Sequence, residues 1–454
     1  MLYHIVKKEV VNNVLSFRFG VTYGLLFGLV LLAVFLMANE YDTRQREYAS
    51  AVKKERARID QLQRIDDPGE LFRAVEGMPF SGLRRPRSAS ILARGLEGEV
   101  PIAVPSRGAV RGFGGSARAT RNALREVFQA PDFAYVVNVV MSLLALLFVF
   151  DAVCGEKEQG TLKLLLAHSL PRDTVLMGKW IGGYISLATP FSAAVLAGFT
   201  YIYASGALDA DGLLRFGLIY GLALVYISAF FTLGLVISTL THRTSTALLV
   251  ALLVWIGWIL VVPNVAPVVA RLAAPVPSRQ VIEAEKAAID READLLRQGI
   301  RKRKVYGDEK ERERIRLAAD EKKRKLDQFR AEQLQTQIEL TQNLARLSPS
   351  ASFLFAATRL AGTGPVLAEY FDQALRHYQH QHRRFRRQIF RTTIGDDPRE
   401  GDWLRAEDIP RFAIAVERVS DSLDAALFDI LLLLVFNALF FMLAYLFFLR
   451  YDIT

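Results

Sequence analysis

The sequence has almost no cysteine and lacks the common nucleotide-binding loop. Cys154 is the only cysteine in 454 residues, so no intramolecular disulfide can form. A domain on the oxidising side of a membrane would therefore be held together by packing alone. The pattern G-x-x-x-x-G-K-[ST] is also missing, because Gly178-Lys179 is followed by Trp180 and has no glycine at the required upstream position. If ATP hydrolysis powers this chain, the ATPase is another chain.

Long apolar runs, by contrast, make up much of the chain. Hydrophobic residues account for 52% of it and charged residues for 23%, and the two kinds are segregated along the sequence. Six runs approach or reach the ~20 residues that an α-helix needs to cross a bilayer. They are Phe19–Met37, Phe133–Phe150, Trp180–Tyr203, Phe216–Leu240, Ala247–Val262 and Ala425–Leu449, of which the fifth is the shortest. The sequence therefore predicts an all-α integral membrane protein with six transmembrane helices.

The third, fourth and fifth of these runs contain no ionisable residue in their interiors. Ionisable groups inside a membrane mark proton relays and ion-coupled transport, so their absence argues against a secondary transporter or a proton-driven pump. The polar exceptions are Asp429, near one end of the sixth run, and the asparagines Asn138 and Asn437. We expect the two asparagines to form hydrogen bonds between helices.

Charged segments divide the chain around the apolar runs. Residues 1–18 form an amphipathic pattern, with apolar residues every three to four positions opposite lysines, which favours a helix in the lipid headgroup layer. The first insert is rich in turn formers and is expected to be a small mixed α/β unit. In the second insert, Arg279–Arg346 has no proline and keeps a seven-residue apolar rhythm, broken at Gly307. It predicts a long antiparallel helical hairpin, with one single long helix as the alternative.

The expected division is 1–18 interfacial helix, 19–40 first span, 41–132 first insert, 133–150 second span, 151–179 loop, 180–262 spans three to five, 263–424 second insert, 425–449 sixth span and 450–454 tail.

Short loops predict the orientation, because long domains cross a membrane regardless of their charge. Basic residues cluster before the first span, between the second and third, between the fourth and fifth, and after the sixth. The one short loop on the opposite side, Ala204–Gly212, contains two aspartates and no basic residue. Both termini and the loop 151–179 are therefore expected to be cytoplasmic, and both inserts extracytoplasmic. The net charge of +10 points to anionic lipid headgroups rather than to nucleic acid as the partner.

The loop 151–179 has the pattern of a short docking helix. Thr161 is a candidate N-cap and Pro171 a stop, which leaves room for about two helical turns. Leu162, Leu165 and Leu166 would form an apolar knob, and the charged rim around it would consist of Glu156, Glu158, Lys163 and Arg172. A knob with a charged rim suits a cleft on a soluble partner. The alternative is a membrane-flanking loop whose charges only set topology.

The run EKEQGTLKLLLAHSLPR, which begins at Glu156 and is followed by Gly178-Lys179, resembles the signature loop of ABC-2 type permeases. The closest subgroup is associated with the maturation of multi-copper enzymes, including nitrous-oxide reductase. The stretches Met141–Glu156, Arg346–Ser350 and Ile91–Pro101 are also similar to this subgroup, whereas the long helices of the second insert depart from its smaller members.

This resemblance implies six spans, an interfacial N-terminal helix, and a coupling helix between the second and third spans. It also implies two permease subunits, identical or sister chains, each resting on an ABC ATPase subunit that binds ATP and magnesium. No cofactor is expected in this chain. The residues expected to couple it to the ATPase are Glu156, Glu158, Gly160, Thr161, Leu162, Leu165, Leu166, Pro171, Arg172, Gly178 and Lys179.

Three of the six histidines, His377, His380 and His382, lie close together and raise the question of a metal site. His377 and His380 share a helical face, but His382 points elsewhere, and the five neighbouring arginines would repel a cation. A basic face toward lipid or an acidic partner is the favoured interpretation.

The sequence thus predicts a non-catalytic permease subunit of the bacterial inner membrane. It would couple ATP hydrolysis by a separate subunit to substrate export. The first alternative is a mechanotransmitter, in which ATP-driven movement reshapes the outer helices to act on an extracytoplasmic protein partner. The second is a passive membrane-anchored coiled-coil scaffold, which would need no docking loop. An intramembrane enzyme is the least favoured interpretation, because paired acids or a nucleophile with a base are lacking.

Overall fold

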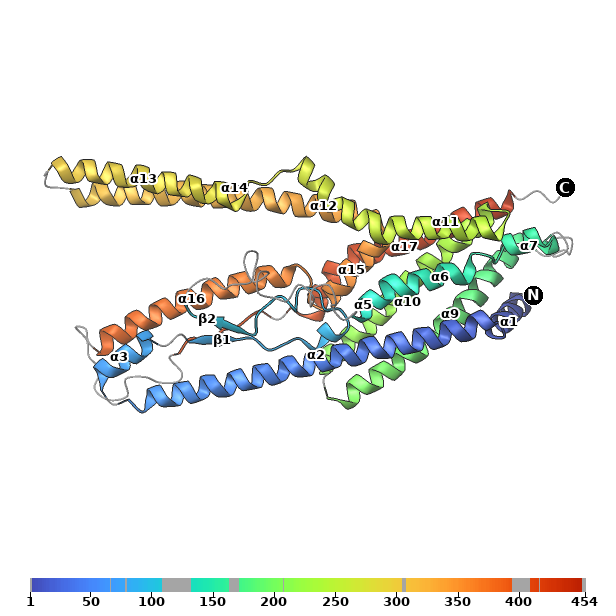
Figure 1. Cartoon of the computed structure of the whole chain (residues 1–454), viewed down its shortest axis with the longest axis horizontal. Coiled ribbons are helices and arrows are strands. Elements are labelled where there is room, and N and C mark those ends of the chain that lie inside the picture. Colours follow the sequence, from blue (N-terminus) through green and yellow to red (C-terminus); the bar gives the residue numbers. More distant parts are fainter. Residues whose placement is uncertain are drawn as a thin grey trace. The chain divides into compact units, whose positions relative to one another are not determined.

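A computed structural model describes most of the chain. The described residues are 2–65, 67–77, 80–107, 132–162, 171–206, 208–303, 308–393, 409–415 and 417–450. They form two compact units, Met1–Trp255 with Ser352–Thr454, and Ile256–Ala351 (Figure 1).

Six helical segments are long and apolar enough to cross a membrane. These are Phe19–Gln63, Phe133–Glu158, Arg172–Ala204, Ala210–Leu240, Thr244–Ala273 and Val419–Leu449. The shortest has 26 residues, which at ~1.5 Å per residue exceeds the ~30 Å thickness of the hydrocarbon layer. The expected number of spans and the mainly helical fold are confirmed.

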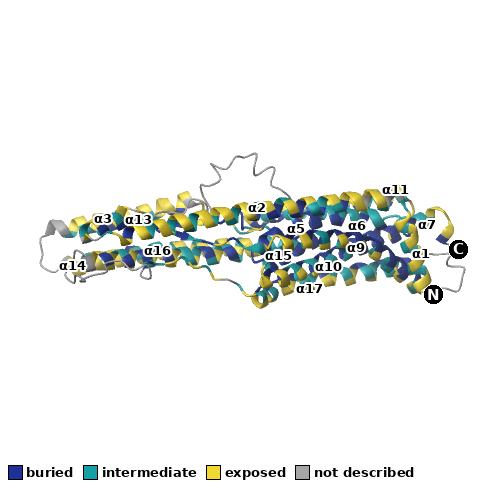
Figure 2. Ribbon diagram, turned by 90° about the horizontal axis from the view of Figure 1, so that it is seen from below, coloured by how far each residue is buried: buried dark blue, intermediate teal, exposed yellow. Residues whose placement is uncertain are grey.

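Helix α10 (Ala210–Leu240) lies at the centre of the first unit, and Figure 2 shows it among the most buried elements. It packs against α6 (Ser142–Val149) and α17 (Val419–Leu449). The Tyr226 hydroxyl donates to the side-chain oxygen of Asn138 at 2.9 Å, and the Asn437 amide donates to the Val225 carbonyl at 3.1 Å. Both asparagines therefore bond between helices, as expected from the sequence.

Two of the spans contain a π-helical turn. In the second span, α5 (Phe133–Tyr135) is followed by η3 (Val136–Met141), and α7 (Cys154–Glu158) comes after α6. The fifth span consists of α11 (Thr244–Ile256), η4 (Gly257–Val261) and α12 (Val262–Ala273). The helix continues through Pro263 and Pro267 to Ala273, beyond the end of the apolar run at Val262. Proline cannot donate to the preceding turn and its ring crowds the carbonyl four residues earlier, and the wider π-helical turn before Pro263 accommodates this crowding.

Helix α2 (Phe17–Gln63) is a single helix of 47 residues that contains the first apolar run and the charged stretch after it. Ser16 caps its start by accepting a hydrogen bond from the Phe19 amide at 3.2 Å. Val34 packs against α9 (Arg172–Ala204) at Gly198, where an added Cβ would lie 3.0 Å from a Val34 methyl group. α2 contains no proline, and the membrane span and the start of the first insert share this one helix.

The described part of the first insert is small and pairs with the end of the second. It comprises α3 (Pro68–Gly77), β1 (Ser81–Leu83), η1 (Ser88–Ile91) and β2 (Ala103–Pro105), with β1 and β2 antiparallel. Helix α16 (Val366–Thr393) packs on α3 and lies beside the strands (Figure 1). At the centre of the insert, Glu97 is fully buried and accepts two hydrogen bonds from Arg84, at 2.8 and 2.9 Å.

The second unit contains two long helices, α13 (Arg279–Arg303) and α14 (Asp308–Ala345), and the link at 304–307 lies outside the described residues. Ion pairs join them between Lys286 and Asp327 at 2.7 Å and between Lys323 and Asp290 at 2.8 Å. The residue numbers of these pairs run in opposite directions, so the helices are antiparallel. Helix α15 (Pro349–Leu360) follows.

His382 of α16 is buried in the aromatic core of the inserts. Its ring contacts those of Phe80, Tyr378 and Phe385, with centroids 5.2, 4.6 and 5.9 Å away. Burial, helped by the charges of Arg386 and Arg107 and opposed by a hydrogen bond with the backbone of Pro410, lowers the pKa of His382 to about 4. The histidine is therefore neutral in the folded protein at physiological pH.

This burial predicts a pH-dependent stability of the inserts. An unfolded histidine has a pKa of ~6.5, so between pH 6.5 and 4 the unfolded state binds the extra proton and stability falls as the pH falls. The loss should reach about 2–3 kcal/mol, and it should be absent from His382→Phe. Hydrogen exchange of α16 at pH 7.5 and 4.5, in the wild type and in His382→Phe, measures this loss of stability. Carboxylates titrate equally in the two proteins, so a difference between them reports on His382. Equal pH dependence in the two proteins would contradict the assignment.

Candidate functional site

The loop between the second and third spans is described at both ends. Its central residues 163–170 lie outside the described residues, and with them Lys163, Leu165 and Leu166. The expected coupling helix is therefore a prediction over most of its length. The two ends of the loop, Asp151–Leu162 and Pro171–Lys179, have detailed contacts.

Lys179, at the second end, is buried and carries the central interaction of the site. It is 5% exposed, and its Nζ lies 2.7 Å from Glu156 Oε1 and 3.1 Å from Glu9 Oε1. Glu156 belongs to α7, at the first end of the loop, and Glu9 to α1 (Leu2–Val14). An ammonium group removed from water is tolerated only with such partners, so this pairing holds three separate helices together.

Two glycines allow α1 to approach α9 closely. A Cβ added to Gly178 would lie 2.6 Å from Ile5 Cγ2, and one added to Gly182 would lie 2.7 Å from Glu9 Cβ. Their spacing of four residues places them on the same face of α9, as in close-packed membrane helices. The contact brings Glu9 to Lys179.

The first end of the loop is held by the connection between α10 and α11. The Ser238 hydroxyl accepts hydrogen bonds from the amides of Val153 and Cys154, at 2.9 and 3.1 Å. Glu158 caps the start of α11, because its Oε2 lies 2.9 Å from both the amide and the hydroxyl of Thr244. Lys157 donates to the carbonyl groups of Thr239 and Thr241. These bonds fix α7 to the fourth and fifth spans.

The remaining predicted residues lie in different surroundings. Gly160 has a φ of +73°, which favours glycine, and the Thr161 hydroxyl donates to the Glu156 carbonyl at 3.4 Å. Leu162 is fully buried inside the chain, so it is not part of an exposed knob as the sequence suggested. Pro171 precedes the first residue of α9, and Arg172 donates to the Leu449 carbonyl at the end of α17, at 2.6 Å.

The structure thus brings Glu156, Gly178 and Lys179 together and directs Glu158 and Arg172 to other helices. Sequence reasoning missed Glu9 and Ser238 as partners of the loop. The Gly178-x-x-x-Gly182 spacing was a usable signal for a helix contact at this point. Glu9 is also the only acid in the otherwise basic segment 1–18. The first end of the loop thus contacts spans two, four and five, and the second end contacts spans three and six.

The three clustered histidines do not converge. His377 and His380 are exposed on α16, whereas His382 is buried among aromatic rings. Within the described ranges, no group of three or more histidine, cysteine, aspartate or glutamate side chains could hold a metal ion.

Comparison with known proteins agrees with this architecture. The sequence model of the family described as "ABC-2 family transporter protein" matches residues 3–453. A "Probable ABC transporter permease protein NosY" from Stutzerimonas stutzeri is 35% identical over 136 residues, which are 29% of this chain and 48% of that protein. A protein of the same name from Pseudomonas aeruginosa is 34% identical over 129 residues, 28% of this chain and 46% of that protein. The matched segment thus spans about half the length of these relatives. Since the family match covers nearly the whole sequence, the chain belongs to the ABC-2 family of transporter proteins, as a non-catalytic subunit that crosses a membrane several times.

Proposed function

We propose that this chain is a permease subunit that couples ATP hydrolysis by a separate ABC ATPase to the export of a substrate across the bacterial inner membrane. The ATPase binds ATP and magnesium and receives the loop 151–179 on its surface. Support comes from the family match and from the absence of a phosphate-binding loop of the G-x-x-x-x-G-K-[ST] type in the sequence.

The observation that carries this proposal is the pairing of Lys179 with Glu156 and Glu9. When an ATPase moves the loop, the displaced α7 cannot leave Lys179 without exposing a buried charge. The movement therefore passes to α9 and to α1 together. Among the apolar residues of α1, Tyr3 is 70% exposed and Val14 is 47% exposed, which suits a helix that lies in the headgroup layer.

A second permease subunit, identical or sister, would cover part of the exposed apolar surface of the bundle. In each of the fifth and sixth spans, only 17% of an apolar segment of 18 residues is buried. Leu249, Leu253 and Val435 are each about 60% exposed in this single chain. Lipid covers whatever a partner subunit leaves free.

Mechanotransmission is the alternative, and helix α2 favours it. The helix continues from the membrane span into the first insert without a break. Outside the apolar run, Glu40 pairs with Arg94 at 3.0 Å and Glu55 accepts a hydrogen bond from the Ser81 amide at 3.1 Å. A tilt of the span would therefore move the insert, where an extracytoplasmic protein partner could bind.

Cysteine labelling tests the proposed orientation, with the loop 151–179 and both termini in the cytoplasm. Cys154 is buried and its thiol donates to the Phe150 carbonyl, so it is a poor reporter and is best replaced by alanine. In Cys154→Ala, an impermeant maleimide should label Ser205→Cys in intact spheroplasts, and Thr161→Cys only in inverted vesicles. Both positions are exposed, at opposite ends of the third span. The reverse labelling pattern would show that the orientation of the chain is opposite to the one proposed.

A substitution in the loop tests the ATPase contact. Leu165→Asp should weaken ATPase binding about a thousandfold or more, because burying an unpaired carboxylate costs several kcal/mol. Leu165→Met preserves volume and apolarity and should bind within about threefold of the wild type. Co-purification at matched expression measures both. If Leu165→Asp retains the ATPase and its turnover, the passive-scaffold interpretation replaces this proposal.

Lys179 provides a separate test of transmission. Lys179→Met should keep the ATPase bound but reduce permease-dependent ATP turnover by about tenfold, the size of a typical coupling energy. The control is Lys8→Met, because Lys8 is an exposed lysine on α1. Equal turnover in the two variants would show that the buried ion pair does not transmit movement.

A further inference from the structure

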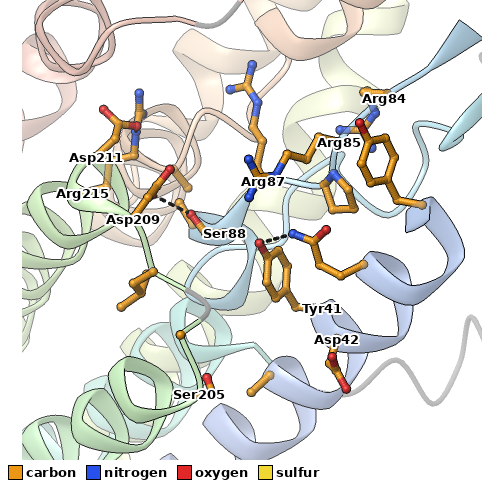
Figure 3. A pocket seen from close by; sticks show the side chains of 18 of the residues that line it. Tyr41, Asp42, Arg84, Arg85, Arg87, Ser88, Ser205, Asp209, Asp211 and Arg215 are labelled. Atoms are coloured by element: carbon orange, nitrogen blue, oxygen red, sulfur yellow. Dashed lines mark hydrogen bonds and ion pairs between the residues drawn. The ribbon is translucent and has the colours of Figure 1, made fainter. Parts of the chain in front are cut away.

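A large polar cavity lies in the first unit, where the first, third and fourth spans meet the first insert. Its volume is about 810 Å³, within the range of ~300–1,000 Å³ that is typical of small-molecule sites. The walls come from α2, from the segment Leu83–Ala89, from the connection between α9 and α10, and from the strand-like segment Phe412–Ile414. Figure 3 shows Asp209, Asp211 and Arg215 on one side and Arg84 and Arg85 on the other.

The acidic residues of this cavity already have partners. Asp209 Oδ1 accepts from the Gly212 amide at 2.9 Å and so caps α10. Asp211 pairs with Arg215 at 2.7 Å, and Asp42 pairs with Arg46 at 2.7 Å. Their negative charge is therefore compensated, and they do not form a cation site.

Two of the four arginines are held mainly by other groups of the chain. Arg84 donates through Nη1 to the buried carboxylate of Glu97 and through Nη2 to the Val100 carbonyl, and only its Nε is buried without an acceptor among the described residues. Arg215 is 3% exposed and donates to the carbonyl groups of Leu360 and Glu417, at 2.6 and 2.7 Å. These two residues hold the cavity together and have little capacity left for a ligand.

Arg85 and Arg87 have donors to spare. Arg85 is exposed and forms no hydrogen bond or ion pair with another residue in the described ranges. Arg87 uses Nη1 on the Gly362 carbonyl at 2.5 Å, while its Nη2 is buried without an acceptor among the residues that the structure describes. Burial lowers the pKa of Arg87, and the Coulomb attraction of Glu97 opposes this only in part. A buried cationic donor without an acceptor is costly, and an anion in the cavity would remove that cost.

The surroundings of the cavity indicate the kind of anion. A planar guanidinium group binds phosphate oxygens in pairs, which favours arginine over lysine at phosphate sites. The cavity is far larger than an inorganic phosphate ion and is lined in part by Tyr41, Tyr201 and Phe412, so it suits an organic ligand. It also lies at the ends of apolar runs, at Ala38 of α2 and before Phe216 of α10, where a lipid headgroup could reach it.

We propose that this cavity binds a phosphate-bearing organic anion, held by Arg85 and Arg87. The phosphate belongs either to a phospholipid headgroup or to a soluble phosphate ester, and both offer the same oxygens. This inference is independent of the ATPase contact, because the cavity and the loop 151–179 lie at opposite ends of the third span.

Binding to the purified full-length protein in detergent tests the proposal. The probes are dihexanoyl phosphatidic acid, glycerol 3-phosphate and inorganic phosphate, with dihexanoyl phosphatidylcholine as the zwitterionic comparison. We expect phosphatidic acid or glycerol 3-phosphate to bind, and Arg85→Gln and Arg87→Gln each to weaken binding by about tenfold or more. Binding of the lipid alone identifies a headgroup site, and binding of glycerol 3-phosphate identifies a site for soluble esters.

The matched control is Arg384→Gln, which removes an exposed arginine of α16 that does not line the cavity. It should change the affinity by less than about twofold. Arg85→Gln leaves the Arg87–Gly362 bond intact, so a folding defect in Arg87→Gln does not prevent the test. The proposal is overturned if no phosphate ester binds, if only inorganic phosphate binds, or if the control weakens binding as much as the two cavity variants.

Discussion

The buried ammonium group of Lys179 constrains the whole end of the bundle that contains α1 and α7. Two carboxylates from different helices satisfy it, and neither can be withdrawn without leaving a charge in a poorly hydrated place. The close contact of α1 with Gly178 and Gly182 positions the first carboxylate. The bonds from Ser238 position the helix that carries the second. The loop is thus one part of an arrangement that involves most of the spans.

The same rule applies where the spans meet the inserts. Arg215 lies in the second turn of the central helix α10 and is buried, and its guanidinium donates to the carbonyl groups of Leu360 and Glu417 and to the hydroxyl of Ser422. These partners come from the end of α15, from the segment before α17 and from α17 itself. One charge therefore holds together chain segments that are about 145–207 residues apart in sequence. Apolar packing alone would leave the angles between these segments less defined, because lipid and protein side chains offer similar contacts.

The parts of this architecture that depend on local composition could be predicted from the sequence. The six apolar runs correspond to six helices long enough to cross a membrane. Glu156 and Lys179 were singled out with the help of the family resemblance, and their ion pair was not predicted. The continuation of the fifth helix beyond Val262 was not foreseen, because Pro263 and Pro267 would ordinarily end a helix. Glu9 was missed because its role depends on how α1 crosses α9, a tertiary contact that no single segment encodes. Leu162 was expected to be part of an exposed knob and is buried.

The length of α2 bears on whether a moving bundle exports a substrate or acts mechanically. Its 47 residues extend about 70 Å at 1.5 Å per residue, more than twice the thickness of the hydrocarbon layer. A tilt of about 5° in the span would displace the far half of such a helix by ~3 Å, enough to change side-chain contacts in the insert. Glu40, Arg44 and Glu55 bind the insert along this length, so the displacement would not be lost at a flexible joint. An export cycle in this chain would therefore move the first insert as well, and transport and mechanical action would share one set of contacts.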